Sequence, residues 1–173
     1  MQRSAEERFD DIYRRHADAV TAYVRRRSAP DSVEDVVAET FVVCWRKLEQ
    51  VPAEPLPWLY AVARKTLANE RRAAARPPVT TAGEAMVRSP EIKGDPVLAR
   101  AFARLAEPDR EILRLVAWDQ LSLHEAARVL GCSYVACRVR FHRARRRLAG
   151  HLERLEQPST AANPRTRPEG AAQ

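Results

Sequence analysis

Residues 122 to 148 constrain the fold more than any other part of the chain. Ser122 and Glu125 have the spacing of a capping box, in which each side chain accepts a hydrogen bond from the other's backbone, and they predict a helix start. Gly131 predicts the end of that short helix, because glycine readily takes the left-handed conformation that follows many helices. Ser133 is placed to cap a second, longer helix. The pattern therefore predicts a helix-turn-helix.

The helix expected after Ser133 has an apolar face and a basic face. Steps of three and four residues join its apolar stripe, which comprises Tyr134, Cys137, Phe141, Ala144 and Leu148. No acidic residue lies between Arg138 and Arg147, so the basic face favours contact with phosphates over simple solvation. Arg138 is placed to read guanine, and small apolar neighbours suit thymine methyl groups or DNA shape. The predicted contacts to duplex DNA are Ser133, Tyr134, Val135, Ala136, Arg138, Val139, Arg140, His142, Arg143 and Arg146.

Cys132, Cys137 and His142 follow one another at five-residue steps, which raises the alternative of a metal or redox site. Zinc requires ligands that converge within about 2.3 Å of one point. Five residues turn a helical side chain by roughly 140°, so Cys137 and His142 point apart, while Cys132 precedes the helix. We expect no metal site and no cofactor. The odd number of cysteines, at helical spacing, indicates a reducing compartment rather than a disulfide framework.

The net charge of +7 indicates an anionic partner, and nucleic acid fits better than a membrane surface. The charged N-terminus lacks the apolar core of a signal peptide. No stretch approaches the roughly 18 apolar residues of a membrane span. We therefore expect a cytoplasmic protein without membrane insertion.

The chain divides into four segments, and the predicted fold class is all-α. Residues 1–75 are expected to form one small helical domain, and residues 96–156 a second with four helices, the helix-turn-helix and no wing. Residues 76–95 contain prolines and glycines without a sustained period, which predicts a flexible linker. Residues 157–173 have the composition of a disordered tail.

Within the first segment, apolar spacing predicts helix from about residue 5 to residue 28, either as two helices or as one bent helix. Ser32 and Asp35 have the form of a capping box for the next helix. Cys44 lies in the apolar stripe of that helix and is interpreted as a small core residue. Residues 51–57 hold three prolines and are expected to form a loop.

With both halves considered, residues 5 to 155 resemble the extracytoplasmic-function (ECF) sigma factors, the small two-domain initiation subunits of bacterial RNA polymerase. The stretch DSVEDVVAETFVVCW is similar to the family's acidic-then-apolar helix, which binds the clamp helices of the polymerase β′ subunit. The alternative is a solvated helix start whose acids are favoured by the helix dipole. The resemblance implies core-polymerase contacts at Glu34, Asp35, Glu39 and Trp45.

The stretch PWLYAVARKTLANERR is similar to the family's −10 segment, which melts promoter DNA and holds one strand; arginines and aromatic rings suit single-stranded DNA. The family usually has Asn where Lys65 stands and Asp where Asn69 stands, which leaves the base preference open. Trp58 and Tyr60 have core packing as their alternative role. The resemblance implies −10 contacts at Trp58, Tyr60, Arg64, Lys65, Asn69, Arg71 and Arg72.

The stretch LSLHEAARVLGCSYVACRVRFHRARRRL is similar to the family's helix-turn-helix for the −35 element. The usual Thr-Val-Lys-Ser-Arg is replaced by residues 136–140, ACRVR, and the loss of two hydroxyls weakens base reading. The resemblance implies a sigma factor without catalytic residues, with core RNA polymerase (β′ clamp helices and β flap), promoter DNA and an anti-sigma factor as partners. Two alternatives are a helix-turn-helix regulator that acts without polymerase, and a nucleic-acid enzyme using His16 or His142.

Overall fold

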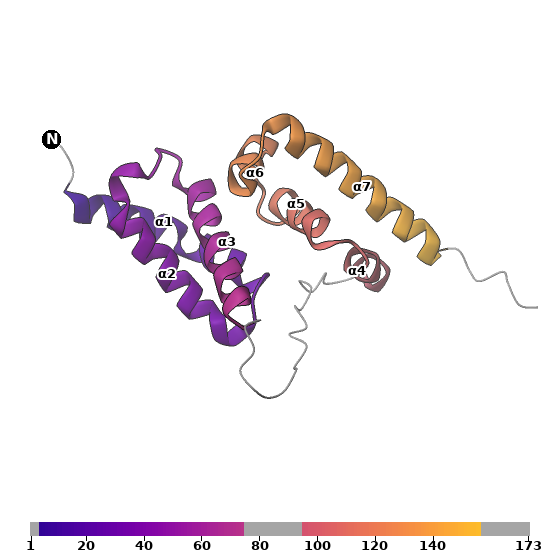
Figure 1. Cartoon of the computed structure of the whole chain (residues 1–173), viewed down its shortest axis with the longest axis horizontal. Helices are drawn as coiled ribbons and strands as arrows, with labels where there is room; N and C mark the ends of the chain where they lie inside the picture. Colours follow the sequence, from indigo (N-terminus) through magenta and orange to yellow (C-terminus); the bar gives the residue numbers. More distant parts are fainter. Residues whose placement is uncertain (1–3, 75–94, 157–173) are drawn as a thin grey trace, which may run out of the picture.

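The computed structural model describes residues 4–74 and 95–156, and every regular element in these two ranges is helical (Figure 1). The predicted all-α fold class is confirmed. The predicted tail lies outside the described residues, and so does the predicted linker apart from Asp95. The domain boundaries themselves stay a prediction.

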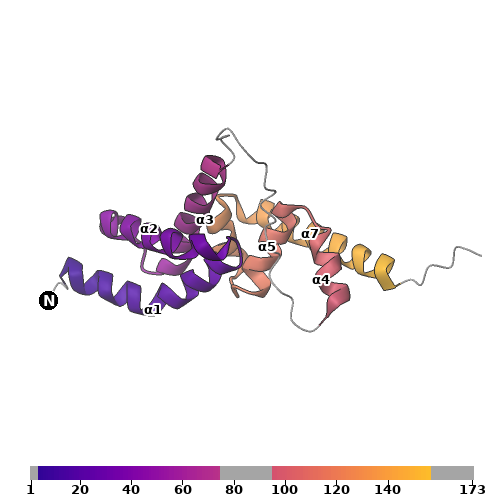
Figure 2. The ribbon, with the colours of Figure 1, turned by 90° about the horizontal axis from the view of Figure 1, so that it is seen from below.

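The N-terminal bundle comprises α1 (Ala5–Arg25), α2 (Val33–Arg46) and α3 (Pro55–Ala74), with the short 3₁₀ turns η1 (Pro30–Ser32) and η2 (Leu48–Gln50) between them. The C-terminal bundle comprises α4 (Pro96–Ala103), α5 (Glu107–Ala117), α6 (Leu123–Leu130) and α7 (Tyr134–Glu156). Figure 2 shows the two bundles next to each other, with α3 on the side of the C-terminal helices.

The first helix is single and ends earlier than its apolar spacing indicates. Ser4 and Glu7 form a capping box at its start, and α1 then runs for 21 residues to Arg25. Arg27 and Ser28 continue the chain with backbone hydrogen bonds to the carbonyl of Val24. The sequence left open whether these apolar positions belong to two helices or to one bent helix. The structure has one uninterrupted helix.

The capping box predicted at Ser32 is wrong. Ser32 lies in η1 with φ −92° and ψ −5°, and its side chain makes no capping hydrogen bond to α2. A capping residue needs extended backbone to turn its side chain over the helix end. Here the 3₁₀ turn supplies a partner instead, because the carbonyl of Pro30 accepts from the backbone N–H of Val33.

The predicted proline loop is shorter than residues 51–57, because α3 begins at Pro55. The first backbone N–H groups of a helix have no partner within the helix, so a proline there loses no hydrogen bond. Pro55 and Pro57 both lie in this first turn. The loop therefore ends at Glu54, and Pro57 is buried.

The N-terminal bundle packs α2 against both α1 and α3. Val20 and Val24 of α1, Val36 and Cys44 of α2, and Leu59 of α3 are fully buried at 0% exposure. Cys44 therefore lies in the core, as its place in the apolar stripe indicated. In the C-terminal bundle, α7 packs against α4, α5 and α6.

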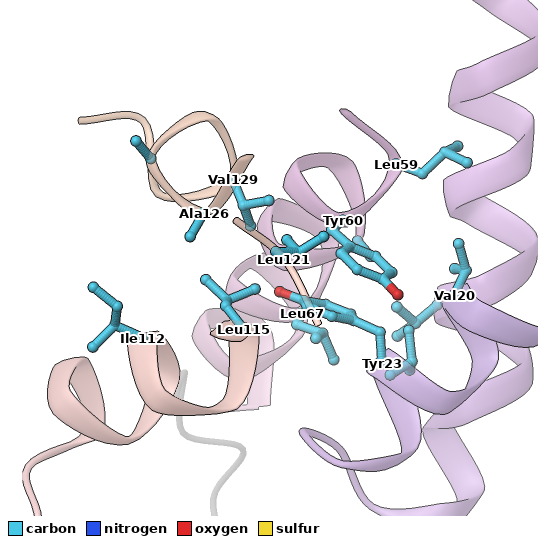
Figure 3. Close-up of a cluster of buried hydrophobic side chains, with 14 of the residues drawn as sticks. Val20, Tyr23, Leu59, Tyr60, Leu67, Ile112, Leu115, Leu121, Ala126 and Val129 are labelled. Carbon is cyan, nitrogen blue, oxygen red and sulfur yellow. The ribbon is translucent and has the colours of Figure 1, made fainter. Parts of the chain in front are cut away.

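The two bundles share one continuous buried cluster, because α3 packs against α6. Figure 3 shows the side chains that meet there, with Tyr23, Tyr60 and Leu67 on one side and Leu115 and Leu121 on the other. All five are at most 5% exposed.

Candidate nucleic-acid interface

The turn that positions α7 has the predicted construction. The hydroxyl of Ser122 accepts from the backbone N–H of Glu125 at 3.3 Å, and the Glu125 carboxylate accepts from the backbone N–H of Ser122 at 2.8 Å. The Ser122 hydroxyl also donates to the Glu125 carboxylate at 2.6 Å, and this hydrogen bond, together with the one from the Ser122 backbone, holds the pKa of Glu125 below its usual value. Gly131 ends α6 with φ +66°, and the hydroxyl of Ser133 accepts from the backbone N–H of Ala136 at 3.2 Å. The helix-turn-helix geometry is therefore fixed by local hydrogen bonds.

The outward face of α7 is open to solvent in this conformation. Val135 is 60% exposed and Val139 is 41% exposed, although both are apolar. The other exposed members of the predicted duplex-binding set are Ser133, Tyr134, Ala136, Arg138, Arg140, His142, Arg143 and Arg146. The structure thus brings this set together along one turn and one helix.

Tyr134 does not belong to the buried stripe in which the sequence placed it. Its side chain is 37% exposed, and its ring stacks on His124 with 4.0 Å between ring centroids. Tyr134 is the first residue of α7, and its ring lies against the exposed start of α6 rather than in the buried cluster. Cys137 and Ala144 are the fully buried members of the stripe.

Two of the arginines that flank the basic face have partners inside the protein. Arg147 donates to the carboxylate of Asp109 on α5 at 2.5 Å. The guanidinium of Arg145 lies over the ring of Phe141, 5.8 Å from its centroid. Arg147 thus helps to hold α7 on α5, a role that the absence of acids within its own helix did not indicate.

The cysteines of the C-terminal bundle pack in the protein rather than forming an exposed site. Cys137 is fully buried, and burial raises the pKa of its thiol. Cys132 is half-buried in the turn. Within residues 4–74 and 95–156, no three His, Cys, Asp or Glu side chains are grouped as metal ligands would be.

The exposed face of α3 carries Arg64, Lys65, Asn69 and Arg72. Arg72 donates to the side-chain oxygen of Asn69 at 2.9 Å, which fixes these two polar groups relative to each other. A groove of about 770 Å³ runs between α2 and α3. It is lined by residues of both predicted binding sets, Asp35, Glu39, Trp58, Lys65 and Asn69 among them. The structure therefore joins the predicted polymerase face and part of the predicted −10 face.

Tyr60 does not lie on that exposed face. It is 2% exposed, its ring stacks on Tyr23 at 4.4 Å, and burial raises its pKa to about 12. In this conformation its ring has no free face for a base, and core packing describes its environment. Arg71 is exposed, but it donates to the backbone carbonyl of Arg27 at 2.8 Å.

An aromatic cluster on α1 and α2 was not predicted as a unit. The ring centroid of Phe9 lies 5.3 Å from that of Trp45, and Tyr13 lies 4.8 Å from Phe41. Trp45 is 47% exposed and Tyr13 is 46% exposed. The cluster extends the predicted polymerase face from the acidic start of α2 to its C-terminal end. Helical spacing on two separate helices could not show that these rings meet.

Comparison with known proteins agrees with this arrangement. The family description "Sigma-70 region 2" matches residues 12–77, and "Sigma-70, region 4" matches residues 97–148. The RNA polymerase sigma factor NccH of Alcaligenes xylosoxydans xylosoxydans is 29% identical over 161 residues, covering 84% of this chain and 87% of NccH.

Two solved structures have the same fold. One is the sigma factor RpoE of Bartonella quintana in a co-crystal with the anti-sigma factor NepR, with 22% identity, a TM-score of 0.63, and coverage of 84% of this chain and 96% of RpoE. The other is CnrH in complex with the cytosolic domain of CnrY, with 27% identity, a TM-score of 0.55, and coverage of 84% and 88%.

The chain belongs to the sigma-70 family of RNA polymerase sigma factors, within its extracytoplasmic-function group. Its function is accordingly to direct promoter recognition in transcription initiation. This family is in general not enzymatic. Among the described helices, none combines the length and the apolar character that crossing a membrane requires.

Proposed function

We propose that the chain divides its work among three helices: α2 binds core RNA polymerase, α3 binds the −10 element and α7 binds the −35 element. The observation that carries this proposal is the coincidence of the two matched regions with the charged faces. Residues 12–77 contain the acidic face of α2 and the basic face of α3, and residues 97–148 contain the basic face of α7.

For core polymerase, the support is an exposed surface with acidic and aromatic parts. Glu34, Asp35 and Glu39 are exposed on α2, and Trp45 is exposed on the same helix. Exposed aromatic rings with charged neighbours are typical of protein interfaces. We assign this surface to the β′ clamp helices, and an additional contact of the C-terminal bundle to the β flap.

For DNA, the support is the set of exposed basic side chains on α7 and α3. The exposed arginines of α7 are suited to phosphates, and Val135 and Val139 are suited to thymine methyl groups. On α3, Lys65 lines the groove and Arg64 and Arg72 are exposed, and these three cations are suited to single-stranded DNA. Trp58, half-buried in the groove, supplies the aromatic surface there.

Further assignments follow from the relatives. RpoE was crystallised with an anti-sigma factor, so an anti-sigma factor is the regulatory partner we assign to this chain. We also assign it to the cytoplasm, without catalytic activity of its own. A regulator acting without polymerase is not favoured, because it leaves region 2 and the α2 surface without a role.

The test is binding to core polymerase, followed by transcription of pooled fragments of the source genome. We expect Asp35→Arg with Glu39→Arg to weaken core binding at least about tenfold, since two attractive charges become repulsive at an interface. The matched control reverses two exposed acids on another helix, Glu153→Arg with Glu156→Arg near the end of α7, and should bind core as the parent does. Equal losses in both pairs, or a parent chain that does not bind core, would overturn the proposal.

A further inference from the structure

Cys132 and Cys137 occupy the two positions that face each other across the start of α7. Ser133 is the capping residue, because its hydroxyl accepts from the backbone N–H of Ala136. Cys132 therefore immediately precedes the cap, and Cys137 is the fourth residue of the helix. Side chains at these two positions often pack together as a hydrophobic staple, which fixes the angle at which the chain enters the helix. In this chain both members of the staple are thiols.

The two thiols are in contact. Burial is the main cause of the raised pKa of Cys137, and the neighbouring Cys132 raises it further, by its charge and by a hydrogen bond between the two side chains. Cys137 belongs to the buried cluster, and Cys132 packs against that cluster. Neither cysteine is in a disulfide, so the pair is a dithiol.

The two thiols differ in what can reach them. Cys137 is 0% exposed, whereas Cys132 is half-buried in the turn between α6 and α7. An oxidant in solution can therefore reach Cys132, while Cys137 stays in the core and in contact with it. An accessible thiol next to a second, resolving cysteine is a frequent arrangement in redox-sensing proteins.

A bond between the two sulfur atoms would displace the turn. A disulfide holds its sulfur atoms about 2.05 Å apart, which is closer than any non-bonded contact. Cys137 is held in the core, so Cys132 has to move, and its backbone N–H donates to the carbonyl of Ala127 at 3.1 Å. The next residues are Ser133, which caps α7, and Tyr134, its first residue. Both belong to the set proposed to bind duplex DNA, so this movement disturbs the DNA-binding end of α7.

We propose that Cys132 and Cys137 form a reversible disulfide that weakens the binding of duplex DNA by α7. The oxidant is a hydroperoxide such as hydrogen peroxide. The O–O bond breaks as one oxygen is transferred to the Cys132 sulfur, which gives a sulfenic acid and releases one water. The Cys137 thiol then attacks that sulfur, so that the S–S bond forms, the S–O bond breaks and a second water leaves. The two thiols lose two electrons and two hydrogen atoms in total, and the peroxide is reduced.

A dithiol reverses this modification by thiol–disulfide exchange, in which the dithiol is oxidised and both cysteines are reduced. Such a transient disulfide is compatible with a reducing compartment, where the disulfides that do occur are usually catalytic or redox-sensing. The effect on DNA rests on the proposed role of α7 at the −35 element, whereas the formation of the disulfide does not.

Mass spectrometry tests whether the disulfide forms. The full chain, purified under reduction, is treated with hydrogen peroxide, alkylated and digested with trypsin without a reductant. Cleavage after Arg128 and Arg138 leaves both thiols on one peptide, residues 129–138. We expect this peptide to be lighter than the reduced peptide by two hydrogen atoms and to carry no alkyl group. A peptide with two alkyl groups, or with an oxidised Cys132 that is not bonded to Cys137, would overturn the proposal.

Fluorescence anisotropy with a labelled duplex of mixed sequence measures the effect on DNA binding. We expect oxidation to weaken binding by the parent chain at least about fivefold, at the lower end of typical coupling between two sites, and dithiothreitol to restore it. Cys132→Ala should bind as the reduced parent does, with or without peroxide. The matched control is Cys44→Ala, which removes the cysteine of α2 and leaves the pair intact, so its binding should respond to peroxide as that of the parent does.

Cys137→Val keeps an apolar side chain in the core and is the second variant if Cys132→Ala does not fold; it should also be insensitive to peroxide. A disulfide that leaves DNA binding unchanged would overturn the control of α7. An equal loss of binding in Cys132→Ala or Cys137→Val would overturn it too, because other oxidised residues would then cause the loss. A reduced parent that does not bind DNA would count against the proposed function, while the mass of peptide 129–138 still decides whether the disulfide forms.

Discussion

The two helices assigned to DNA, α3 and α7, are in contrasting situations. The basic face of α7 is largely open to solvent, and the turn before it is fixed by its own short-range hydrogen bonds. By contrast, α3 packs against α6, with Tyr60 buried and Arg71 bonded to the Arg27 carbonyl. The turn that presents α7 is thus fixed by residues close together in the sequence, whereas the surroundings of α3 are fixed by contacts between residues far apart in it.

The largest expected effect comes from reversing charges on the exposed basic face of α7. Arg143→Glu with Arg146→Glu should weaken duplex DNA binding about 100-fold, since each lost charge-assisted contact contributes about 1.5 kcal/mol. The slope of log K against log salt should fall by about 0.9 for each phosphate contact removed. Fluorescence anisotropy over a range of salt concentrations measures both.

The matched control for this pair is Arg100→Glu with Arg104→Glu, two exposed positions at α4 with the same charge change. A similar loss of affinity in the control would show that net charge alone, rather than the face of α7, determines binding.

A smaller effect tests whether the turn positions α7. Gly131→Ala should lower the free energy of unfolding by about 1 kcal/mol, because φ is +66° and an L-residue is strained there. No atom lies within 4 Å of the added Cβ, so the cost comes from the backbone alone. Urea denaturation followed by circular dichroism measures it.

Gly150→Ala provides the control with the opposite sign. Gly150 lies inside α7, and its added Cβ would be an ordinary 3.6 Å from the Arg154 side chain, so alanine should stabilise by about 0.5–1 kcal/mol. If both substitutions changed the free energy of unfolding in the same direction, the left-handed backbone at Gly131 would not be what makes Gly131→Ala destabilising.

The smallest effect concerns the cap of α6 and depends on pH. Ser122→Ala should cost about 1 kcal/mol near neutral pH. The pKa of Glu125 is lowered in the folded protein, so its contribution is present above the unfolded value, near about 4.3, and is lost as the pH falls through the folded value. The difference between parent and Ser122→Ala should therefore shrink in acid. Glu125→Gln, which cannot titrate, should remove this pH dependence; a difference that stays constant would contradict the cap assignment.

The contrast also explains which features the sequence could predict. Ser122, Glu125, Gly131 and Ser133 act within four residues of their own positions, so their spacing indicated the turn correctly. The capping box predicted at Ser32 was wrong because a 3₁₀ turn satisfies the first backbone N–H of the helix instead. Residue spacing alone does not distinguish a capping box from such a turn.

Contacts between distant residues had no comparable signal. Arg27 resembles any other basic residue near a helix end until Glu111, 84 positions later, is placed against it. From the sequence, Tyr60 could either contact the −10 element or pack in the core. Its ring stacks on Tyr23 in the core of this conformation. Arg147 looked like part of a uniform basic face, although Asp109 on another helix holds it. Charge pattern along one helix predicts a surface, but tertiary structure determines which members of it are free.

The separation of Arg27 from its carboxylate partners, 84 and 92 residues along the chain, has a consequence for synthesis on the ribosome. At about 5–20 residues per second, the N-terminal bundle, which is complete once Ala74 has been made, exists for roughly 2 to 9 seconds before Asp119 has been made. During that interval the ion pairs of Arg27 with Glu111 and Asp119 cannot form, and the acidic face of α2 is already complete. A nascent chain is therefore open by default, and the buried ion pairs between the bundles are acquired only with the second half of the polypeptide.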